Sequence, residues 1–167
     1  MIIIPQSLIA VWPDFSLEIK NDLTFETGCR YHLSGPNGSG KTSLITQILI
    51  PKIQQSKSYI LYFEQQMHLQ LYAIKAYAAL MHKDRVISSE ADMMAYLFEN
   101  LQMAYSAQPR DIYLIADESH ELQNLMQLCD FAPHALIFTS HHNLLSEARS
   151  VHFHPKSLQC SEVYVPD

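Results

Sequence analysis

The order of hydrophobic and polar residues predicts strands that alternate with helices along most of the chain. Residues 15–20 alternate with a period of two, which is typical of a half-buried strand. Runs rich in β-branched and aromatic residues predict more deeply buried strands. Further strands are predicted at residues 2–4, 8–11, 23–25, 30–34, 59–63, 111–116 and 135–140. We expect the strand at 23–25 to continue the sheet that contains residues 15–20.

Helical patterns occupy the intervals between these strands. Helices are predicted at residues 43–50, 71–82, 91–105 and 121–129. Pro51 and the polar run that follows are expected to end the first helix, and Ser88-Ser89-Glu90 is a candidate cap for the third. The Met and Tyr side chains of residues 67–105 are expected to pack in the core, with a binding surface as the alternative.

Strands and helices in this order predict an α/β fold with a mainly parallel sheet and right-handed crossovers. A chain of 167 residues is long enough for one proper core and too short for two ordinary domains. We therefore expect a single domain spanning residues 1–167, in which residues 67–105 form a small helical part.

Composition and charge narrow the class of protein. The net charge of −6 argues against a broad surface for binding nucleic acid, although a local basic patch remains an alternative. The three cysteines lie far apart and lack metal-ligand spacing, which favours reduced thiols in a cytosolic protein. The sequence contains no run of about 20 apolar residues that could span a membrane. A cytoplasmic location is the expectation.

Residues 35–42, Gly-Pro-Asn-Gly-Ser-Gly-Lys-Thr, match the phosphate-loop pattern between a predicted strand and a predicted helix. Gly35, Gly38 and Gly40 allow a tight turn that aims successive amides at one anion. Lys41 supplies a positive charge for the terminal phosphates, and the Thr42 hydroxyl can bind Mg²⁺. This motif predicts that the chain binds a nucleoside triphosphate.

Two acidic residues follow a buried strand further along the chain. Asp117 and Glu118 come directly after the apolar run that ends at Ala116. At the carboxyl end of a parallel strand, Asp117 can hold Mg²⁺ and Glu118 can orient or deprotonate water. The alternative is a pair of surface acids that open a loop.

Two further polar residues follow buried strands. Gln65 comes just after the strand at 59–63 and could reach both Mg²⁺ and the attacking water, with Gln66 as a competitor. His141 follows the strand at 135–140 and could hydrogen-bond the γ-phosphate, with His142 as a competitor. A plain solvated glutamine and an ordinary loop histidine remain the alternatives.

These elements, in this order, resemble those of the ATP-binding cassette ATPases from about Trp12 to Glu147. Residues 35–43 resemble the Walker A motif, and residues 112–118 resemble Walker B with its catalytic glutamate. Residues 62–65 are similar to the Q-loop, and residues 139–141 are similar to the switch-histidine loop.

The resemblance implies a P-loop NTPase fold with a mainly parallel sheet flanked by helices, a reduced antiparallel β part and a small helical insertion. It implies ATP and Mg²⁺ as ligands, with Thr42, Asp117 and Gln65 at the metal and Glu118, Gln65 and His141 in catalysis. Trp12 stands where the family stacks an aromatic ring on adenine, although a buried or edge-strand tryptophan is an equal alternative. The implied nucleotide contacts are Trp12, Gly35, Pro36, Asn37, Gly38, Ser39, Gly40, Lys41, Thr42 and Ser43.

The resemblance also implies a partner. A membrane permease subunit or another protein is expected, together with a nucleotide-driven homodimer, so the chain could lie peripherally at the inner membrane. However, no LSGGQ signature precedes residues 112–118, and the nearest segment, residues 87–90, lacks both glycines. Ser119 replaces the family's proline, and residues 120–122 are all that remains of the D-loop. These losses concern dimer closure and partner contact rather than the nucleotide pocket.

Three functions follow from the sequence. The first is a small ATPase of the cassette type that works with a separate partner. The second is a non-catalytic module that changes its binding of a partner when ATP binds. The third is a cassette ATPase that acts on nucleic acid, which the acidic charge disfavours.

Overall fold

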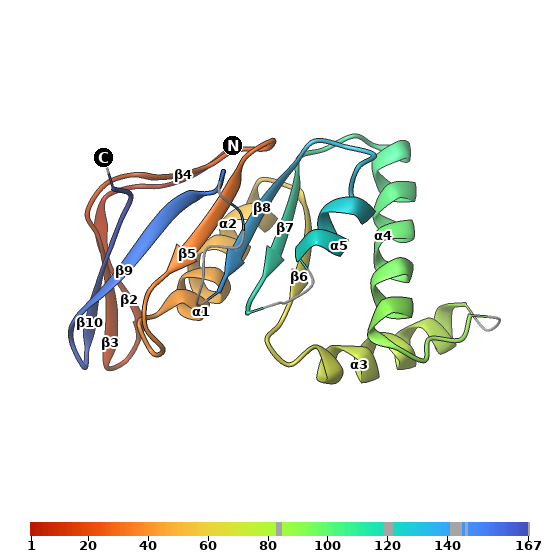
Figure 1. Ribbon diagram of the computed structural model, residues 1–167, viewed down its shortest axis with the longest axis horizontal. Coiled ribbons are helices and arrows are strands. Elements are labelled where there is room, and N and C mark those ends of the chain that lie inside the picture. The colour runs from red at the N-terminus through yellow and green to blue at the C-terminus, as the bar shows by residue number, and fades with distance from the viewer. Residues whose placement is uncertain (83–84, 119–121, 141–144, 146, 167) are drawn as a thin grey trace.

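The computed structural model describes residues 1–166 except 83–84, 119–121, 141–144 and 146 (Figure 1), and the side chains of 122–124 are left aside. The described strands are β1 Ile2–Ile4, β2 Ser7–Trp12, β3 Phe15–Ile19, β4 Leu23–Phe25, β5 Arg30–Ser34, β6 Tyr59–Phe63, β7 Ile112–Ala116, β8 His134–Thr139, β9 Arg149–Ser157 and β10 Cys160–Tyr164. The helical segments are α1 Lys41–Ser43, the π-helical η1 Leu44–Leu49, α2 Ile50–Gln55, α3 Met67–Met81, α4 Glu90–Ala107 and α5 Leu122–Leu128.

Eight of these strands form one mixed sheet in the order β2-β3-β10-β9-β5-β8-β7-β6. The five strands from β9 to β6 run parallel to one another. Within this sheet, the described antiparallel pairs are β2–β3 and β9–β10, towards the other edge. The predicted α/β architecture with a mainly parallel central sheet is therefore confirmed.

The strand order brings distant parts of the sequence together. Strand β8 lies between β5, which leads into the 35–40 loop, and β7, which leads into Asp117. In the register of β7 and β8, Ala116 lies opposite Phe138, so Asp117 and Thr139 leave the sheet side by side. The loop and the acidic pair consequently emerge at the same edge of the sheet.

Alternation along the buried strands gives the molecule two cores. On β7, Tyr113 and Ile115 face the core that contains the helix after the loop, whereas Leu114 and Ala116 face the core built with α4 and α5. In Figure 1 the segment α1–η1–α2 covers one face of the parallel strands, and α4 and α5 cover the other. Strands that are buried on both faces read as continuous apolar runs, which is why they were recognisable in the sequence.

The helix after the loop is longer than predicted. It continues from Lys41 to Gln55 and includes Pro51, which the sequence analysis placed in a connection. A π-helical turn precedes the proline, with the Ile50 amide donating to the carbonyl of Ile45. The wider winding relieves the contact that a proline ring makes with the carbonyl one turn earlier, so the helix can pass through Pro51.

Three strand predictions need correction. Strand β4 does not continue the main sheet but pairs antiparallel with β1 in a separate two-stranded sheet. Strand β6 is an edge strand whose residues are mostly half-buried rather than fully buried. Strands β9 and β10 were not predicted, because residues 149–164 mix histidine, lysine and proline with few apolar positions.

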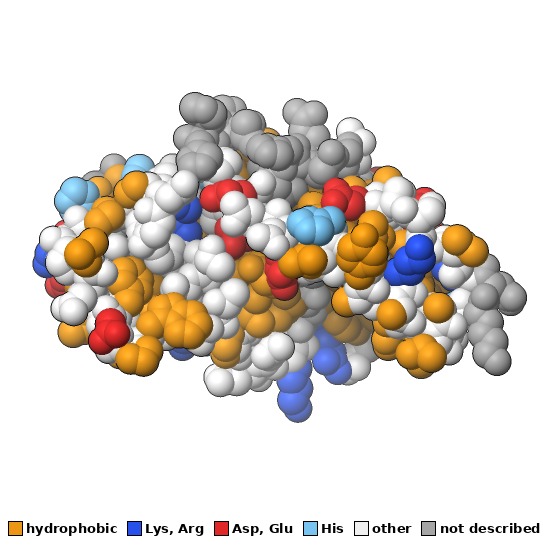
Figure 2. Space-filling view, turned by 90° about the horizontal axis from the view of Figure 1, so that it is seen from below, with side chains coloured by type: hydrophobic (Ala, Val, Ile, Leu, Met, Phe, Trp, Pro, Cys, Tyr) orange, Lys and Arg blue, Asp and Glu red, His pale blue; other side chains and the backbone are white. Residues whose placement is uncertain are grey.

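Helix α3 contradicts the expectation that the Met and Tyr side chains of residues 67–105 lie in the core. The expectation holds on α4, where Met93, Met94 and Tyr96 are buried. On α3 only Met67 and Ala78 are buried, and Tyr72 is 69% exposed. Figure 2 shows hydrophobic side chains spread over this part of the surface. Within the described ranges, none of the helices combines the length and apolar composition that crossing a bilayer demands.

Candidate functional site

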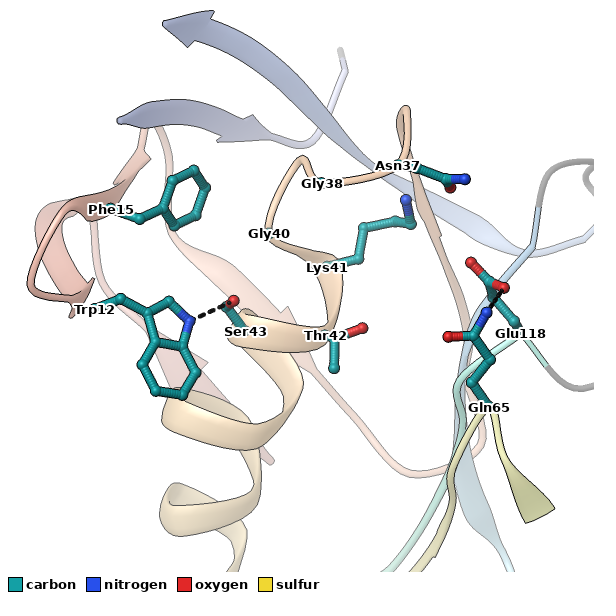
Figure 3. A pocket seen from close by; sticks show the side chains of 10 residues that line it. All are labelled: Trp12, Phe15, Asn37, Gly38, Gly40, Lys41, Thr42, Ser43, Gln65 and Glu118. Atoms are coloured by element: carbon teal, nitrogen blue, oxygen red, sulfur yellow. Dashed lines mark hydrogen bonds between the residues drawn. The ribbon is translucent and has the colours of Figure 1, made fainter. Parts of the chain in front are cut away.

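The 35–40 loop and the start of its helix line a cavity of about 470 Å³ at the carboxyl edge of the sheet. Figure 3 shows Trp12 and Phe15 at one end of this cavity, Gln65 and Glu118 at the other, and the loop between them. The full lining is Trp12, Phe15, Asn37, Gly38, Gly40, Lys41, Thr42, Ser43, Gln65 and Glu118. Residues predicted from separate parts of the sequence thus meet around one space.

The loop has the geometry that a polyanion requires. Gly38 has a φ of +75°, a left-handed conformation that turns its amide away from regular structure. Of the loop amides at 38–40, only that of Ser39 has a carbonyl partner among the described residues, the oxygen of Pro36 at 3.2 Å. The amides of Gly38 and Gly40 therefore remain as donors at the N-terminus of a continuous helical segment.

Lys41 is held against the loop. Its Nζ donates to the carbonyls of Gly35 at 2.8 Å and Pro36 at 2.9 Å, and the residue is 8% exposed. Burial lowers the pKa of the Lys41 ammonium from its ordinary value, while the charges of Glu118 and Asp117 act in the opposite direction. The two carbonyls and the two acids together keep a buried positive charge compensated.

Thr42 and Asp117 meet directly. The Thr42 Oγ1 donates to Asp117 Oδ2 at 2.6 Å, which joins the helix after the loop to the end of β7. A hydroxyl and a carboxylate are hard oxygen donors of the kind that Mg²⁺ prefers when it also binds phosphate. The donor set therefore fits a magnesium ion.

A second, smaller hollow of about 200 Å³ adjoins this contact, and Thr42 and Gln65 line both hollows. Asp117 and Tyr62 line the smaller hollow, and burial raises the pKa of the Tyr62 phenol, with the charge of Asp117 adding to the effect. Thr42 and Gln65 thus border both spaces, whereas Asp117 borders only the smaller one.

Gln65 and Glu118 are hydrogen-bonded, with the Gln65 Nε2 donating to Glu118 Oε2. The contact follows from the sheet, since β6 and β7 are neighbours and Phe63 pairs with Ala116. Gln66, the competing residue, precedes α3 and lines the smaller hollow instead. The structure therefore brings Gln65, rather than Gln66, to Glu118.

Trp12 ends the edge strand β2 and remains 51% exposed. Its Nε1 donates to Ser43 Oγ at 3.0 Å, so one edge of the indole ring is tied to the helix after the loop (Figure 3). A tryptophan buried in the core, one of the alternatives from the sequence, is excluded. The ring lines the cavity from an edge strand.

Some predicted residues lie outside the described part of the chain. These are His141 and its competitor His142, together with Ser119 and residues 120–121 of the reduced D-loop. Residues 87–90, the nearest match to a family signature, adjoin and begin α4, where Ser89 accepts a hydrogen bond from the Asp92 amide in a capping box.

Two residues of the site were missed in the sequence. Phe15 lines the cavity beside Gly40. In the sequence it begins the alternating residues 15–20, a pattern that indicates a strand and gives no sign of a binding role. Thr139 contacts both acids, with its Oγ1 donating to Asp117 Oδ1 at 2.7 Å and accepting from the Glu118 amide at 2.7 Å. The signal available in the sequence was that Thr139 is a polar residue directly after the apolar residues 135–138.

Comparison of the whole sequence with known proteins finds no match, whereas comparison of the structure finds similar folds. No protein-family model matches this chain, and no curated protein matches it. Among solved structures, an archaeal ribosome recycling factor, aABCE1, in complex with the ribosomal stalk protein aP1 superposes with a TM-score of 0.54 at 15% identity. The match covers 98% of this chain and 39% of that chain.

At 15% identity this superposition shows a similar fold and nothing more. Two other solved structures superpose less closely. A KaiC-like protein from Pyrococcus horikoshii has a TM-score of 0.47 at 12% identity, with 86% of this chain and 81% of that chain covered. Trip13 from Rhizobiales has a TM-score of 0.44 at 17% identity, with coverage of 76% and 45%. At these identities the likeness concerns the fold alone.

Proposed function

We propose that this chain binds MgATP and hydrolyses it as a compact ATPase of the cassette type that works with a protein partner. The observation that carries the proposal is the hydrogen bond between Thr42 and Asp117, beside a cavity lined by Lys41 and by two loop glycines whose amides lack a carbonyl partner among the described residues. This arrangement joins a phosphate-binding element to a metal-binding acid, which is the minimum that phosphoryl transfer requires.

In this proposal each residue keeps its place in the structure, and the hydrogen-bond partners of Lys41 change. Phosphate oxygens replace the carbonyls of Gly35 and Pro36 as acceptors for the Lys41 ammonium. Thr42 and Asp117 hold Mg²⁺, which when bound neutralises charge on the phosphates. Glu118 accepts a proton from the attacking water or orients it, and the amide of Gln65 fixes the direction of the Glu118 carboxylate.

The adenine ring is assigned to the end of the cavity lined by Trp12 and Phe15. The indole ring is half exposed and its Nε1 is anchored by Ser43, which suits stacking on a base. His141 completes the proposal as the γ-phosphate contact that the family resemblance implies. The partner, whether a permease subunit, another protein or a second copy, belongs to the same proposal.

The binding step is tested by titrating the chain with MgATP and MgGTP while the molecular mass is measured in each state. We expect MgATP to bind more tightly than MgGTP, and Lys41→Ala to weaken MgATP binding by about tenfold or more, because charged hydrogen bonds are lost. Lys75→Ala, on the exposed side of α3, is the matched control and should bind as the wild type does. Equal affinity in all three proteins would refute the assigned role of the loop.

A non-catalytic, ATP-dependent binding module is the second candidate. It is favoured because residues 87–90, the nearest match to the family signature, lack its glycines and lead instead into the capping box of α4. Steady-state phosphate release separates the two functions. If the chain is an ATPase, Glu118→Gln should release phosphate much more slowly than the wild type while its affinity for MgATP is unchanged. Equal background rates in the two proteins would leave only the binding module.

A further inference from the structure

Thr139 occupies the centre of the proposed site without facing its cavity. It is the last residue of β8 and is fully buried. Because β8 lies between β5 and β7, Thr139 pairs with Leu33 of the strand that leads into the loop and stands beside Asp117 of the acidic pair. The position therefore adjoins both halves of the site.

The hydroxyl of Thr139 uses both of its hydrogen-bonding roles on the acidic pair. It donates to Asp117 Oδ1 at 2.7 Å, while Thr42 donates to the other oxygen of the same carboxylate at 2.6 Å. With both oxygens engaged, the plane of the Asp117 carboxylate is fixed. A carboxylate held in this way presents its remaining lone pairs in one direction.

The same hydroxyl accepts the amide of Glu118 at 2.7 Å. Glu118 has a φ of +54°, a left-handed conformation that is unfavourable for a residue with a Cβ atom. The hydrogen bond stabilises that backbone conformation, which directs the Glu118 side chain towards Gln65. One hydroxyl thus controls the orientation of both acids.

Packing alone does not account for a threonine here. A valine has almost the same shape, has a higher preference for the interior and needs no hydrogen-bond partner. The neighbouring positions of β8, Ile137 and Phe138, are fully apolar and buried. A hydroxyl at this point is explained by what it bonds.

We propose that Thr139 is a positioning residue that sets the carboxylate of Asp117 for Mg²⁺ and the backbone of Glu118 for the attacking water. The inference rests on the proposed function, because it assigns a role within the same site. Its consequence is specific: loss of the hydroxyl weakens the Mg²⁺-dependent part of nucleotide binding and leaves the contacts of the 35–42 loop with phosphate in place.

The experiment compares Thr139→Val, Thr139→Ser and the wild type in the full chain. The measured quantities are the affinity for ATP in excess chelator, the Mg²⁺ concentration that gives half-maximal strengthening of ATP binding, and the midpoint of thermal unfolding. We expect Thr139→Val to raise the half-maximal Mg²⁺ concentration by about tenfold or more. Metal-free ATP affinity should stay within about twofold, and Thr139→Ser should restore the wild-type Mg²⁺ dependence.

Thr24→Val is the matched control, because it removes a hydroxyl from β4 in the separate two-stranded sheet. It should leave the Mg²⁺ dependence unchanged. If Thr139→Val fails to fold, the pair Thr139→Ala and Thr139→Ser differs in the same hydroxyl and gives the same comparison.

The possible outcomes separate the inference from the proposed function. Unchanged Mg²⁺ dependence in a less stable Thr139→Val would show a structural role and overturn the inference. An equal loss of metal-free and Mg²⁺-dependent binding would overturn it as well. If the wild type shows no strengthening of ATP binding by Mg²⁺, the proposed function itself fails, and the role of Thr139 falls with it.

Discussion

At the scale of single residues, the loop glycines differ in what limits them. A Cβ atom on Gly35 would lie 2.7 Å from the carbonyl oxygen of Phe153, which belongs to the backbone of β9 and cannot move aside easily. A Cβ atom on Gly38 would meet nothing within 4 Å, although the φ of +75° still disfavours a side chain. Gly35 is constrained by its neighbour and Gly38 only by its own backbone.

This difference predicts unequal effects of alanine substitution. Gly38→Ala should lower the free energy of unfolding by about 1 kcal/mol, because the left-handed conformation is costly for alanine. Gly35→Ala should lower it by about 1–3 kcal/mol more, because the new methyl group overpacks against β9. Denaturant unfolding of both variants measures the difference. Equal losses of unfolding free energy in the two variants would mean that β9 does not restrict a side chain at position 35.

At the scale of elements, helix α4 shows a local signal that the sequence alone could convey. Ser89 accepts from the amide of Asp92, and the Asp92 carboxylate accepts from the amide of Ser89. The hydrogen bonds from Ser88 and Ser89 lower the pKa of Asp92 to about 2. The cap, its charge and the helix N-terminus support one another within four residues of sequence.

The lowered pKa predicts how stability depends on pH. The unfolded chain binds a proton at Asp92 near its ordinary value of 3.8, and the folded chain binds one only near 2. The contribution of Asp92 is therefore complete above about pH 4 and is lost as the pH falls from about 4 to 2. Over this window Asp92→Asn should unfold with a shallower pH dependence than the wild type.

Unfolding curves at several pH values between about 2 and 5 provide the measurement. Glu162, whose pKa the Lys156 and Lys20 side chains lower to about 2, contributes in the same window in both proteins. The difference between wild type and Asp92→Asn therefore isolates the cap. Identical slopes would show that Asp92 does not titrate differently in the folded chain.

At the scale of the whole molecule, the hairpin β9–β10 lies in the sheet between β3, from the N-terminal part of the chain, and β5, which leads into the loop. Strand β9 pairs with β5 in parallel, and β10 pairs with β3. Phe153 of β9 is buried in the same core as the helix after the loop. The hairpin therefore supports the strand that carries the loop from the side opposite β8.

Two substitutions in this hairpin test its structural role. Phe153→Ala should reduce the free energy of unfolding by about 3–5 kcal/mol, because it leaves a cavity beside β5. Leu158→Ala, in the turn between the two strands, removes a side chain that is 99% exposed and should change stability by less than about 0.5 kcal/mol. Thermal or denaturant unfolding of the pair gives the comparison, and similar losses would contradict the buried position of Phe153.

The sequence predicted those features whose signal is local. Strands buried on both faces, such as β7 and β8, read as continuous apolar runs, and the motif at residues 35–42 fixes its own turn through its glycines. Ser89 was recognised as a cap for the same reason. Two predictions were wrong: that the first helix ends near Pro51, and that the Met and Tyr side chains of α3 are buried. Both depend on tertiary packing, because it decides whether a π-helical turn forms and whether another element covers a helix face.

The chain itself therefore determined a phosphate-loop motif, an acidic pair and a parallel α/β pattern. Only the tertiary structure decided that β8 lies between β5 and β7, that Gln65 rather than Gln66 reaches Glu118, and that Thr139 holds both acids. It also decided that residues 149–164 complete the sheet. The physical reason is that strand order and register depend on contacts between residues from about 20 to more than 100 positions apart, which no local pattern of polarity encodes.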